Sequence, residues 1–257
     1  MNGLERDNPM KIAIIVAGGA GLRMKTPLRK QYLLLNGVPI LAMTLQAFAE
    51  SGLFSRIHVV VPSEDIEFCK TKILPLSISG HEEKKIPVQF VSGGKNRQDS
   101  VCNGIMSIEN RDSLVVVHDG VRPFITQSKI SDCIKAAEKH GAACLGLPIQ
   151  DTLKKVDSNG CILETLERHS TWYTQTPQTF TYSLLRKAHE KARKEGFLGT
   201  DDACLVERMG VRVIMVEGDK LNIKITTRED MILAEMISAN LGGSNLLKNL
   251  LSRQEKS

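Results

Sequence analysis

Glycines and fixed cations close to the N-terminus have the types and the spacing of a phosphate-binding site. Gly18, Gly19 and Gly21 end an apolar, β-branched run, and Arg23 and Lys30 follow them. Glycines let backbone N–H groups approach a phosphate without interference from a Cβ atom, and the cations add charge that amides cannot supply. The segment therefore predicts a site for a nucleotide or another phosphate.

Two common glycine-loop patterns do not fit this segment. A P-loop requires a glycine directly before Lys-Ser or Lys-Thr, whereas here Met24 precedes Lys25-Thr26. A dinucleotide fingerprint requires a third glycine, where this chain has Met24. The P-loop pattern therefore fails, and a dehydrogenase is disfavoured. A glycine-rich turn without a ligand would account for the glycines, but it leaves Arg23 and Lys30 unexplained.

A second glycine loop, Ser92–Val101, lies between an expected strand and a helical pattern. Gly94 again allows close approach of the backbone, and Ser100 offers a hydroxyl near a helix start. The alternative is an ordinary loop in which Asp99 or Ser100 caps the helix. The loop alone leaves both interpretations open.

A carboxylate and further cations follow later strand-like runs. Asp119 comes directly after an apolar strand and can bind a ribose hydroxyl or a magnesium–phosphate complex, while Arg122 can bind a second anion or pair with Asp119. We expect His118 to be a packed strand-end residue. Lys224 lies between two isoleucines in a strand-like run, either as a phosphate ligand or as an edge-strand lysine.

These residues need a sheet to position them, and the sequence alternates strand and helix signals. The expected strands are Ile12–Val16, Ile57–Val61, Val88–Val91, Leu114–His118, Ala142–Leu147 and Val211–Val216; the expected helices include Val38–Ser51, Ser128–Lys139 and Tyr182–Lys194. Such alternation predicts an α/β fold with a mostly parallel sheet, whose ligands bind at the carboxyl ends of the strands.

The segment Asp151–Thr171 interrupts this alternation. Its Asn159-Gly160 pair predicts a β-hairpin, because a type I′ turn needs positive φ at two positions. A lone hairpin is marginal in water and must pack on something. It is either an arm that reaches a second subunit or a hairpin lying on its own domain.

The composition favours small anionic substrates. The 257 residues carry a net charge of +5 with scattered cations, three Tyr and one Trp, so neither a basic stripe nor a base-stacking platform predicts nucleic-acid binding. Six cysteines show no metal-ligand spacing, and no apolar run approaches the ~18 residues of a membrane span. With a polar N-terminal segment, we expect a cytoplasmic protein without membrane contact.

Seven motifs in order, over residues 11–240, resemble the 2-C-methyl-D-erythritol 4-phosphate cytidylyltransferase family. They are Ala17-Gly18-Gly19-x-Gly21-x-Arg23-Met24 with Lys30-Gln31, Asp99-Ser100-Val101, His118-Asp119-x-x-Arg122-Pro123, Asp151-Thr152, Gln175-Thr176-Pro177-Gln178, Thr200-Asp201-Asp202-Ala203 and Asn222-Ile223-Lys224-Ile225-Thr226. Two positions depart from the family pattern: Gly18 stands where a second Ala is frequent, and Arg29 replaces the usual Pro before Lys30.

The resemblance implies a Rossmann-like α/β fold, twisted and mostly parallel with helices on both faces, and a hairpin arm at about residues 149–172 that crosses a homodimer. It implies one nucleotidyltransferase domain over 1–240 and a tail over 241–257. The CTP pocket would comprise Ala17, Gly18, Gly19, Gly94, Lys95, Ser100 and Asp119, with Arg23 and Lys30 on the triphosphate. The sugar phosphate would meet Asp119, Arg122, Thr152, Arg168, Thr176 and Lys224.

The implied reaction is attack by the phosphate of the sugar phosphate on the α-phosphorus of CTP, with release of pyrophosphate. A phosphate monoester has a second pKa of ~6, so no general base is required at neutral pH. We assign Arg23 and Lys30 to transition-state charge, and Arg168 and Lys224 to the incoming phosphate. We assign Mg²⁺ mainly to the triphosphate oxygens, and Asp119 is a candidate direct ligand that the sequence leaves open. The alternatives are an enzyme for ribitol 5-phosphate and a catalytically silent nucleotide-binding protein; the retained cations disfavour the latter.

Overall fold

The computed structural model describes residues 9–19, 29–77 and 86–242, and for 241 and 242 only the backbone. Of the residues predicted to act in the site, Arg23 lies outside the described residues, as does the predicted tail beyond residue 242.

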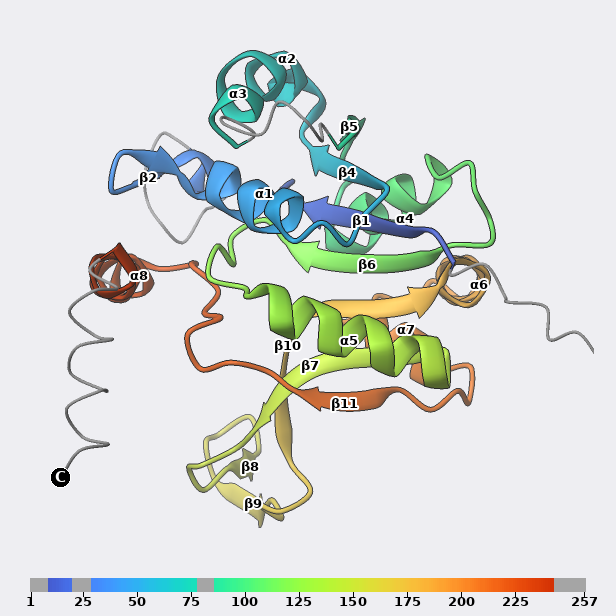
Figure 1. Ribbon diagram of the computed structural model, residues 1–257. Coiled ribbons are helices and arrows are strands. Elements are labelled where there is room, and N and C mark those ends of the chain that lie inside the picture. Colours follow the sequence, from blue (N-terminus) through green and yellow to red (C-terminus); the bar gives the residue numbers. More distant parts are fainter. Residues whose placement is uncertain (1–8, 20–28, 78–85, 243–257) are drawn as a thin grey trace, which may run out of the picture.

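A seven-stranded sheet forms the centre of the molecule, in the order β11-β7-β10-β6-β1-β4-β5 (Figure 1). Its strands are β1 (Lys11–Val16), β4 (Arg56–Val61), β5 (Val88–Ser92), β6 (Leu114–Asp119), β7 (Ala142–Pro148), β10 (Trp172–Thr181) and β11 (Ile214–Glu217). Every neighbouring pair is parallel except the two pairs that β10 makes with β6 and β7. The predicted mostly parallel sheet is confirmed, and each of the six expected strands is present, although the last begins at Ile214.

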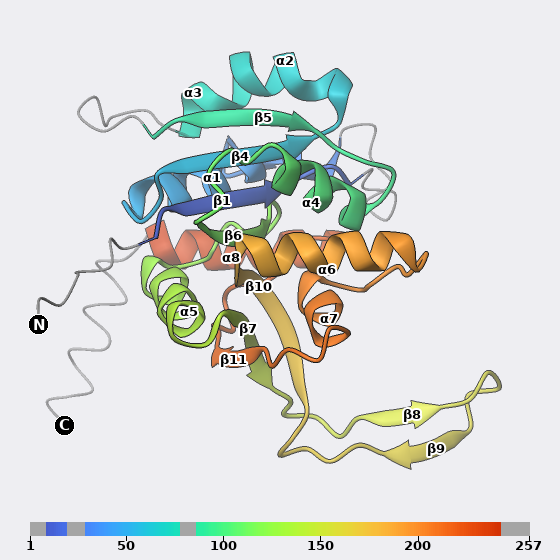
Figure 2. The ribbon, with the colours of Figure 1, turned by 90° about the vertical axis from the view of Figure 1, so that its right-hand side faces the viewer.

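Helices cover both faces of this sheet, and Figure 2 shows them as one layer on each side of it. They are α1 (Ile40–Glu50), α2 (Ile66–Phe68), α3 (Leu74–Ser77), α4 (Arg97–Met106), α5 (Gln127–His140), α6 (Tyr182–Lys194), α7 (Asp202–Glu207) and α8 (Arg228–Gly242). Successive side chains of a strand point to opposite faces. Ile15 of β1 therefore packs in the core cluster of α1 and α5, and Ile14 in that of α4, α6 and α7.

Strand β10 was not predicted, and its place in the sheet is unusual. It runs antiparallel between two parallel strands, and its register against β7 shifts between Thr174 and Gln178. The Thr176–Pro177 peptide, which is cis, lies within this irregular stretch. Proline has no N–H to give to a ladder and is accommodated inside a sheet at such irregularities.

The predicted hairpin is present and projects from the body of the molecule (Figure 2). It consists of β8 (Lys154–Val156) and β9 (Ile162–Thr165). The predicted turn type is wrong: Gly160 has a φ of 81°, but Asn159 does not have positive φ. Instead, the carboxylate of Asp157 accepts hydrogen bonds from the backbone N–H groups of Asn159 and Cys161, at 2.9 and 2.8 Å. The side chain of Asp157 therefore stabilises a wider turn.

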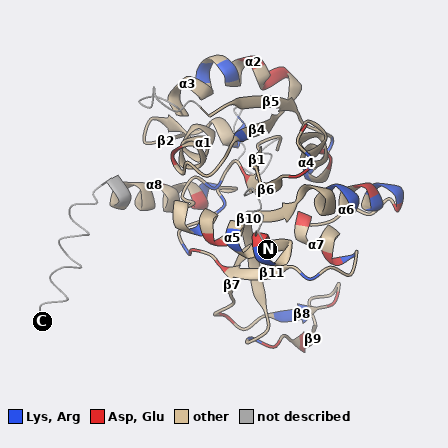
Figure 3. Cartoon of the chain, turned by 45° about the vertical axis from the view of Figure 1, so that its right-hand side comes forward, with Lys and Arg blue, Asp and Glu red and all other residues tan. Residues whose placement is uncertain are grey.

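Charged residues are distributed over many elements. In Figure 3, Lys and Arg positions occur around α2, on α6 and on the hairpin, interspersed with Asp and Glu positions. Within the described part of the chain, no helix combines the length and the apolar character that a membrane crossing needs.

Candidate active site

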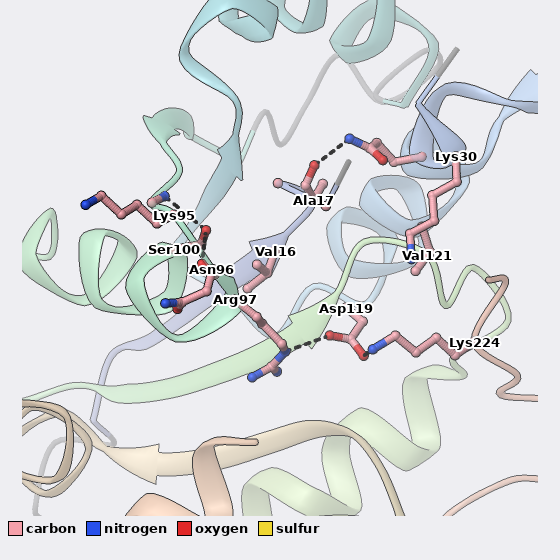
Figure 4. Close-up of a pocket in the computed structure, with 14 residues that line it drawn as sticks. Val16, Ala17, Lys30, Lys95, Asn96, Arg97, Ser100, Asp119, Val121 and Lys224 are labelled. Carbon is pink, nitrogen blue, oxygen red and sulfur yellow. Dashed lines mark hydrogen bonds and ion pairs between the residues drawn. The ribbon is translucent and has the colours of Figure 1, made fainter. Parts of the chain in front are cut away.

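A cavity of about 270 Å³ opens at the carboxyl edge of the sheet, where β1, β5 and β6 end (Figure 4). Four cations and one carboxylate line it: Lys30, Lys95, Arg97, Lys224 and Asp119. The remaining lining residues are Val16, Ala17, Gly18, Gly19, Gln31, Gly94, Asn96, Ser100 and Val121. The cavity therefore suits a polyanionic ligand.

The two glycine loops approach each other closely at this cavity. A Cβ atom on Gly18 or on Gly93 would lie 3.3 Å from the Ser100 hydroxyl oxygen, and one on Gly94 would lie 2.3 Å from the Cβ of Asp99. Only glycine fits at position 94 without displacing the backbone around it. The approach leaves backbone groups of both loops facing the cavity.

Ser100 holds the second loop in shape. Its hydroxyl accepts a hydrogen bond from the Gly94 N–H at 3.1 Å and donates to the Asn96 carbonyl at 2.8 Å. The alternative interpretation predicted Asp99 or Ser100 as the helix cap, and this is wrong. The cap is Asn96, whose side chain accepts a hydrogen bond from the Asp99 N–H at 2.8 Å. Ser100 is therefore free of the capping role and braces the loop.

Asp119 is the electrostatic centre of the site. Its carboxylate lies 3.2 Å from Arg97 Nε, 2.8 Å from Lys224 Nζ and 3.6 Å from Arg122 Nε. Burial alone would raise the pKa of Asp119, but the three cations hold it well below its usual range. The carboxylate is therefore ionised throughout the physiological pH range.

Behind Asp119, His118 and Thr176 form a buried pair. His118 Nε2 lies 3.1 Å from the Arg122 carbonyl, which can only accept, so Nε2 carries the proton. Burial lowers the pKa of His118 to about 4, and the neutral ring's Nδ1 accepts from the Thr176 hydroxyl at 3.0 Å. Thr176 Oγ1 in turn accepts from the Asp119 N–H at 3.1 Å. As predicted, His118 is a packed strand-end residue.

Arg97 connects Asp119 to a second buried carboxylate. Its Nη1 lies 2.8 Å from Asp202 Oδ2, and Asp202 Oδ1 lies 3.0 Å from Nε2 of His189. Burial opposes charge on His189, but the hydrogen bonds to Asp202 and Cys102 raise its pKa to about 9. An ionic chain therefore runs from the cavity to α6 through α4 and α7.

The described residues of one chain bring together most of the predicted site, but not all of it. Thr152 and Arg168 are exposed on the hairpin and bonded to each other, with Arg168 Nη2 3.0 Å from Thr152 Oγ1; neither lines the cavity. Arg122 is 9% exposed and donates to the Asn222 carbonyl at 2.6 Å. Lys224 reaches the cavity from an irregular segment and not from the strand expected there.

Arg97 is a functional candidate that the sequence analysis did not name, and Gln31 and Asp202 are two that it quoted within motifs but gave no role. Gln31 is 1% exposed, and its amide donates to the Ala17 carbonyl at 2.7 Å. Arg97 begins α4 directly after the glycine loop. A cation at the start of a helix, where the macrodipole disfavours positive charge, is the signal that could have identified it.

A parallel sheet with glycine loops and an array of cations at its carboxyl edge defines a nucleotide-handling α/β protein, and comparison with known proteins gives its family. The profile of the 2-C-methyl-D-erythritol 4-phosphate cytidylyltransferase family matches residues 11–240. The chain belongs to this family.

Individual relatives agree with this assignment. Proteins named 2-C-methyl-D-erythritol 4-phosphate cytidylyltransferase from Caldanaerobacter subterraneus and Syntrophus aciditrophicus are 45% and 44% identical, over 87% and 88% of this chain and 96% and 95% of their own. The crystal structure of 4-diphosphocytidyl-2C-methyl-D-erythritol synthase from Anaerococcus prevotii matches with a TM-score of 0.78 and 31% identity, over 90% of this chain and 96% of that one.

The His189–Asp202 pair predicts a loss of stability at alkaline pH. The pKa of His189 is raised above its ordinary value of 6.5, so its contribution is complete below pH 6.5 and is lost as the pH rises through about 9. Between pH 7 and 10, the Tm of the wild type should therefore fall more steeply than that of His189→Gln, by roughly 2–4 °C for each kcal/mol lost. Thermal unfolding at constant ionic strength measures this, and equal slopes would contradict it.

Proposed function

We propose that this site transfers the cytidylyl group of CTP to the phosphate of 2-C-methyl-D-erythritol 4-phosphate, the activity that gives the family its name and a step of non-mevalonate isoprenoid synthesis. A phosphate oxygen attacks the α-phosphorus, the bond to the β-phosphate oxygen breaks, and pyrophosphate leaves. The observation that carries the proposal is a ring of cations around one ionised carboxylate, beside two glycine loops, in a chain of this family.

The nucleotide would occupy the glycine-loop side of the cavity. Ala17, Gly18, Gly19, Gly94, Lys95 and Ser100 would contact CTP, and Asp119 would lie between the two substrates. All seven line the cavity. Lys30, together with Arg23 from outside the described residues, would stabilise the charge that develops on the triphosphate. Preorganised cations do this with little reorganisation during the reaction.

The sugar phosphate would bind on the Lys224 side. Lys224 is 37% exposed, so its ammonium can contact the incoming phosphate as well as Asp119. Arg122 and Thr176 are buried and engaged with Asp119 and its neighbours. They would serve this substrate mainly by fixing the carboxylate and the end of β6.

The remaining contacts would come from the hairpin of a second copy in a homodimer. Thr152 and Arg168 lie outside their own chain's cavity lining, which leaves them available to a neighbour. The hairpin also exposes apolar side chains that a partner would cover: Leu153, Val156, Ile162 and Leu163 are 38–63% exposed. Such exposure is typical of an interaction surface.

A divalent metal, Mg²⁺ in our proposal, fits this donor set only as a partner of the nucleotide. Among the described residues, no three His, Cys, Asp or Glu side chains form a metal-ligating group. Asp119 could supply one carboxylate oxygen, which suits Mg²⁺, since this ion commonly combines one or two carboxylates with substrate phosphates. When bound, it would neutralise charge on the triphosphate. Free thiols at all six cysteines are compatible with a cytoplasmic location.

Substrate identity is tested by pyrophosphate release. With CTP and Mg²⁺, 2-C-methyl-D-erythritol 4-phosphate should be turned over with a kcat/KM at least ~10²-fold above that for ribitol 5-phosphate, because a site built for one set of hydroxyls leaves polar groups unpaired with the other. Faster turnover of ribitol 5-phosphate would establish the alternative enzyme. No turnover of either would indicate a silent binding protein.

Lys30 should act chiefly in the transition state. Lys30→Ala is expected to lower kcat by roughly 10²-fold, the scale for removing one preorganised charge. Lys191→Ala, on an exposed lysine of α6, is the control and should leave kcat unchanged. If steady-state kinetics showed a change only in KM for CTP, the lysine would instead contribute uniform binding.

The shared-site arrangement is tested by complementation. Lys30→Ala and Arg168→Ala homodimers should each keep only about 1% of the wild-type kcat. In a mixed dimer, the pocket with intact Lys30 would receive the intact Arg168 from its partner, so one site of two should recover. CTP turnover after subunit exchange, with differential tags confirming the mixed dimers, measures the recovery.

Lys30→Ala mixed with Lys224→Ala is the matched control. Both lesions lie in the cavity of one chain, so every pocket keeps one defect and no activity should return. Confirmed exchange of Lys30→Ala with Arg168→Ala that likewise restores nothing would show that the hairpin serves its own subunit.

A further inference from the structure

The orientation of the Lys30 side chain depends on a short turn that begins at Lys30. Contacts with neighbouring segments hold this turn on two sides. Lys30 begins the 3-10 turn η2 (Lys30–Tyr32), whose other residues are 1% and 4% exposed. On one side, Gln31 donates to the carbonyl of Ala17 at the end of β1, at 2.7 Å. This contact ties the turn to the first glycine loop.

Arg29 and Asp65 attach the other side. Arg29 directly precedes the turn, and its Nε lies 3.1 Å from Oδ2 of Asp65, the last residue of η3 (Ser63–Asp65). Its Nη2 also contacts Glu64. The hydroxyl of Tyr32 donates to the same Asp65 oxygen at 2.9 Å. One carboxylate oxygen therefore holds the residue before Lys30 and the residue at the end of the turn.

Burial keeps the tyrosine in its donating form. The Tyr32 ring packs edge-on against Phe68 with centroids 5.2 Å apart, and Cys69 Sγ lies 3.4 Å from the hydroxyl. Burial, together with Cys69 and Asp65, raises the pKa of Tyr32 well above its usual range. The hydroxyl is therefore a permanent hydrogen-bond donor to Asp65.

We propose that Arg29 is a positioning residue for the reaction: with Asp65 and Tyr32 it forms a clasp that fixes how Lys30 enters the cavity. The proposal rests on the role given above to Lys30. Since Arg29 is 31% exposed, its ion pairs contribute little to global stability. Their loss would instead let the turn shift, and a displacement of about 1 Å in a catalytic cation costs up to about 10²-fold in rate.

The test compares Arg29→Met with a matched control, Arg186→Met. Arg186 is also 31% exposed and pairs with Glu190 at 2.8 Å on α6. Arg29→Met should lower kcat by about tenfold with KM for CTP changed by less than about threefold, and Arg29→Lys, which keeps the charge, should recover most of the loss. Both Met variants should have similar Tm values. A kcat for Arg29→Met equal to that of Arg186→Met would overturn the proposal. So would a lower Tm of Arg29→Met that accounts for its loss of kcat.

A second arm separates failure of the clasp from failure of the proposed function. If Arg29 acts through Lys30, Arg29→Met in a Lys30→Ala background should lower kcat by no more than about twofold further. An additional tenfold loss would show that Arg29 acts independently and would overturn the proposal. If Lys30→Ala alone leaves kcat unchanged, it is the role of Lys30 that fails.

Discussion

The structure depends on keeping the carboxylate of Asp119 ionised while it is only 8% exposed. A buried carboxylate is tolerated as an anion only where cations and hydrogen bonds compensate for the lost water. Arg97, Lys224 and Arg122 supply this compensation, and they come from the start of α4, from the segment after β11 and from the loop after β6. Each of these segments must follow a path that returns its cation to the end of β6. The charge of Asp119 therefore determines the path of these segments at the carboxyl edge, as the apolar core determines the packing of the sheet.

The same constraint gives a reason for the irregular strand at the centre of the sheet. The regular ladder between β10 and β6 ends at the pair Gln178–Val117, next to Pro177, so the last residues of β6 have no ladder partner on β10. The Asp119 N–H is satisfied instead by the Thr176 hydroxyl, which also pairs with His118. The side chain replaces a backbone partner and fixes the residue that carries the charge. A regular strand would pair the backbone but would not connect it to this buried network.

The sequence predicted the parallel part of the fold because buried parallel strands are continuous apolar runs, whatever their partners. It did not predict β10, since Pro177 argues against a central strand and only tertiary pairing overrides that signal. The turn at Asn159-Gly160 was misassigned for a related reason: the competing side chain of Asp157 decides its geometry. Positive φ at both positions occurs instead at Asn36 and Gly37, between β2 (Leu34–Leu35) and β3 (Val38–Pro39), which the sequence analysis did not single out.

Part of the site was predictable, because loops that follow the carboxyl ends of parallel strands meet at one edge of the sheet. Gly18, Ser100 and Asp119 follow such strands, and all three line the cavity. The pairing of Arg97 was not predictable, because its two carboxylate partners lie 22 and 105 residues away in the chain. That pairing also has a consequence for binding. The cations around Asp119 are already paired with it before any ligand arrives. A phosphate that binds one of these cations therefore replaces its ion pair with Asp119 by a new ion pair and does not meet an unpaired cation. Lys224 is the most exposed of the three, at 37%, and can make this exchange while Arg97 and Arg122 keep the carboxylate in place. The site can thus stay ordered without its ligand and still release one cation to it.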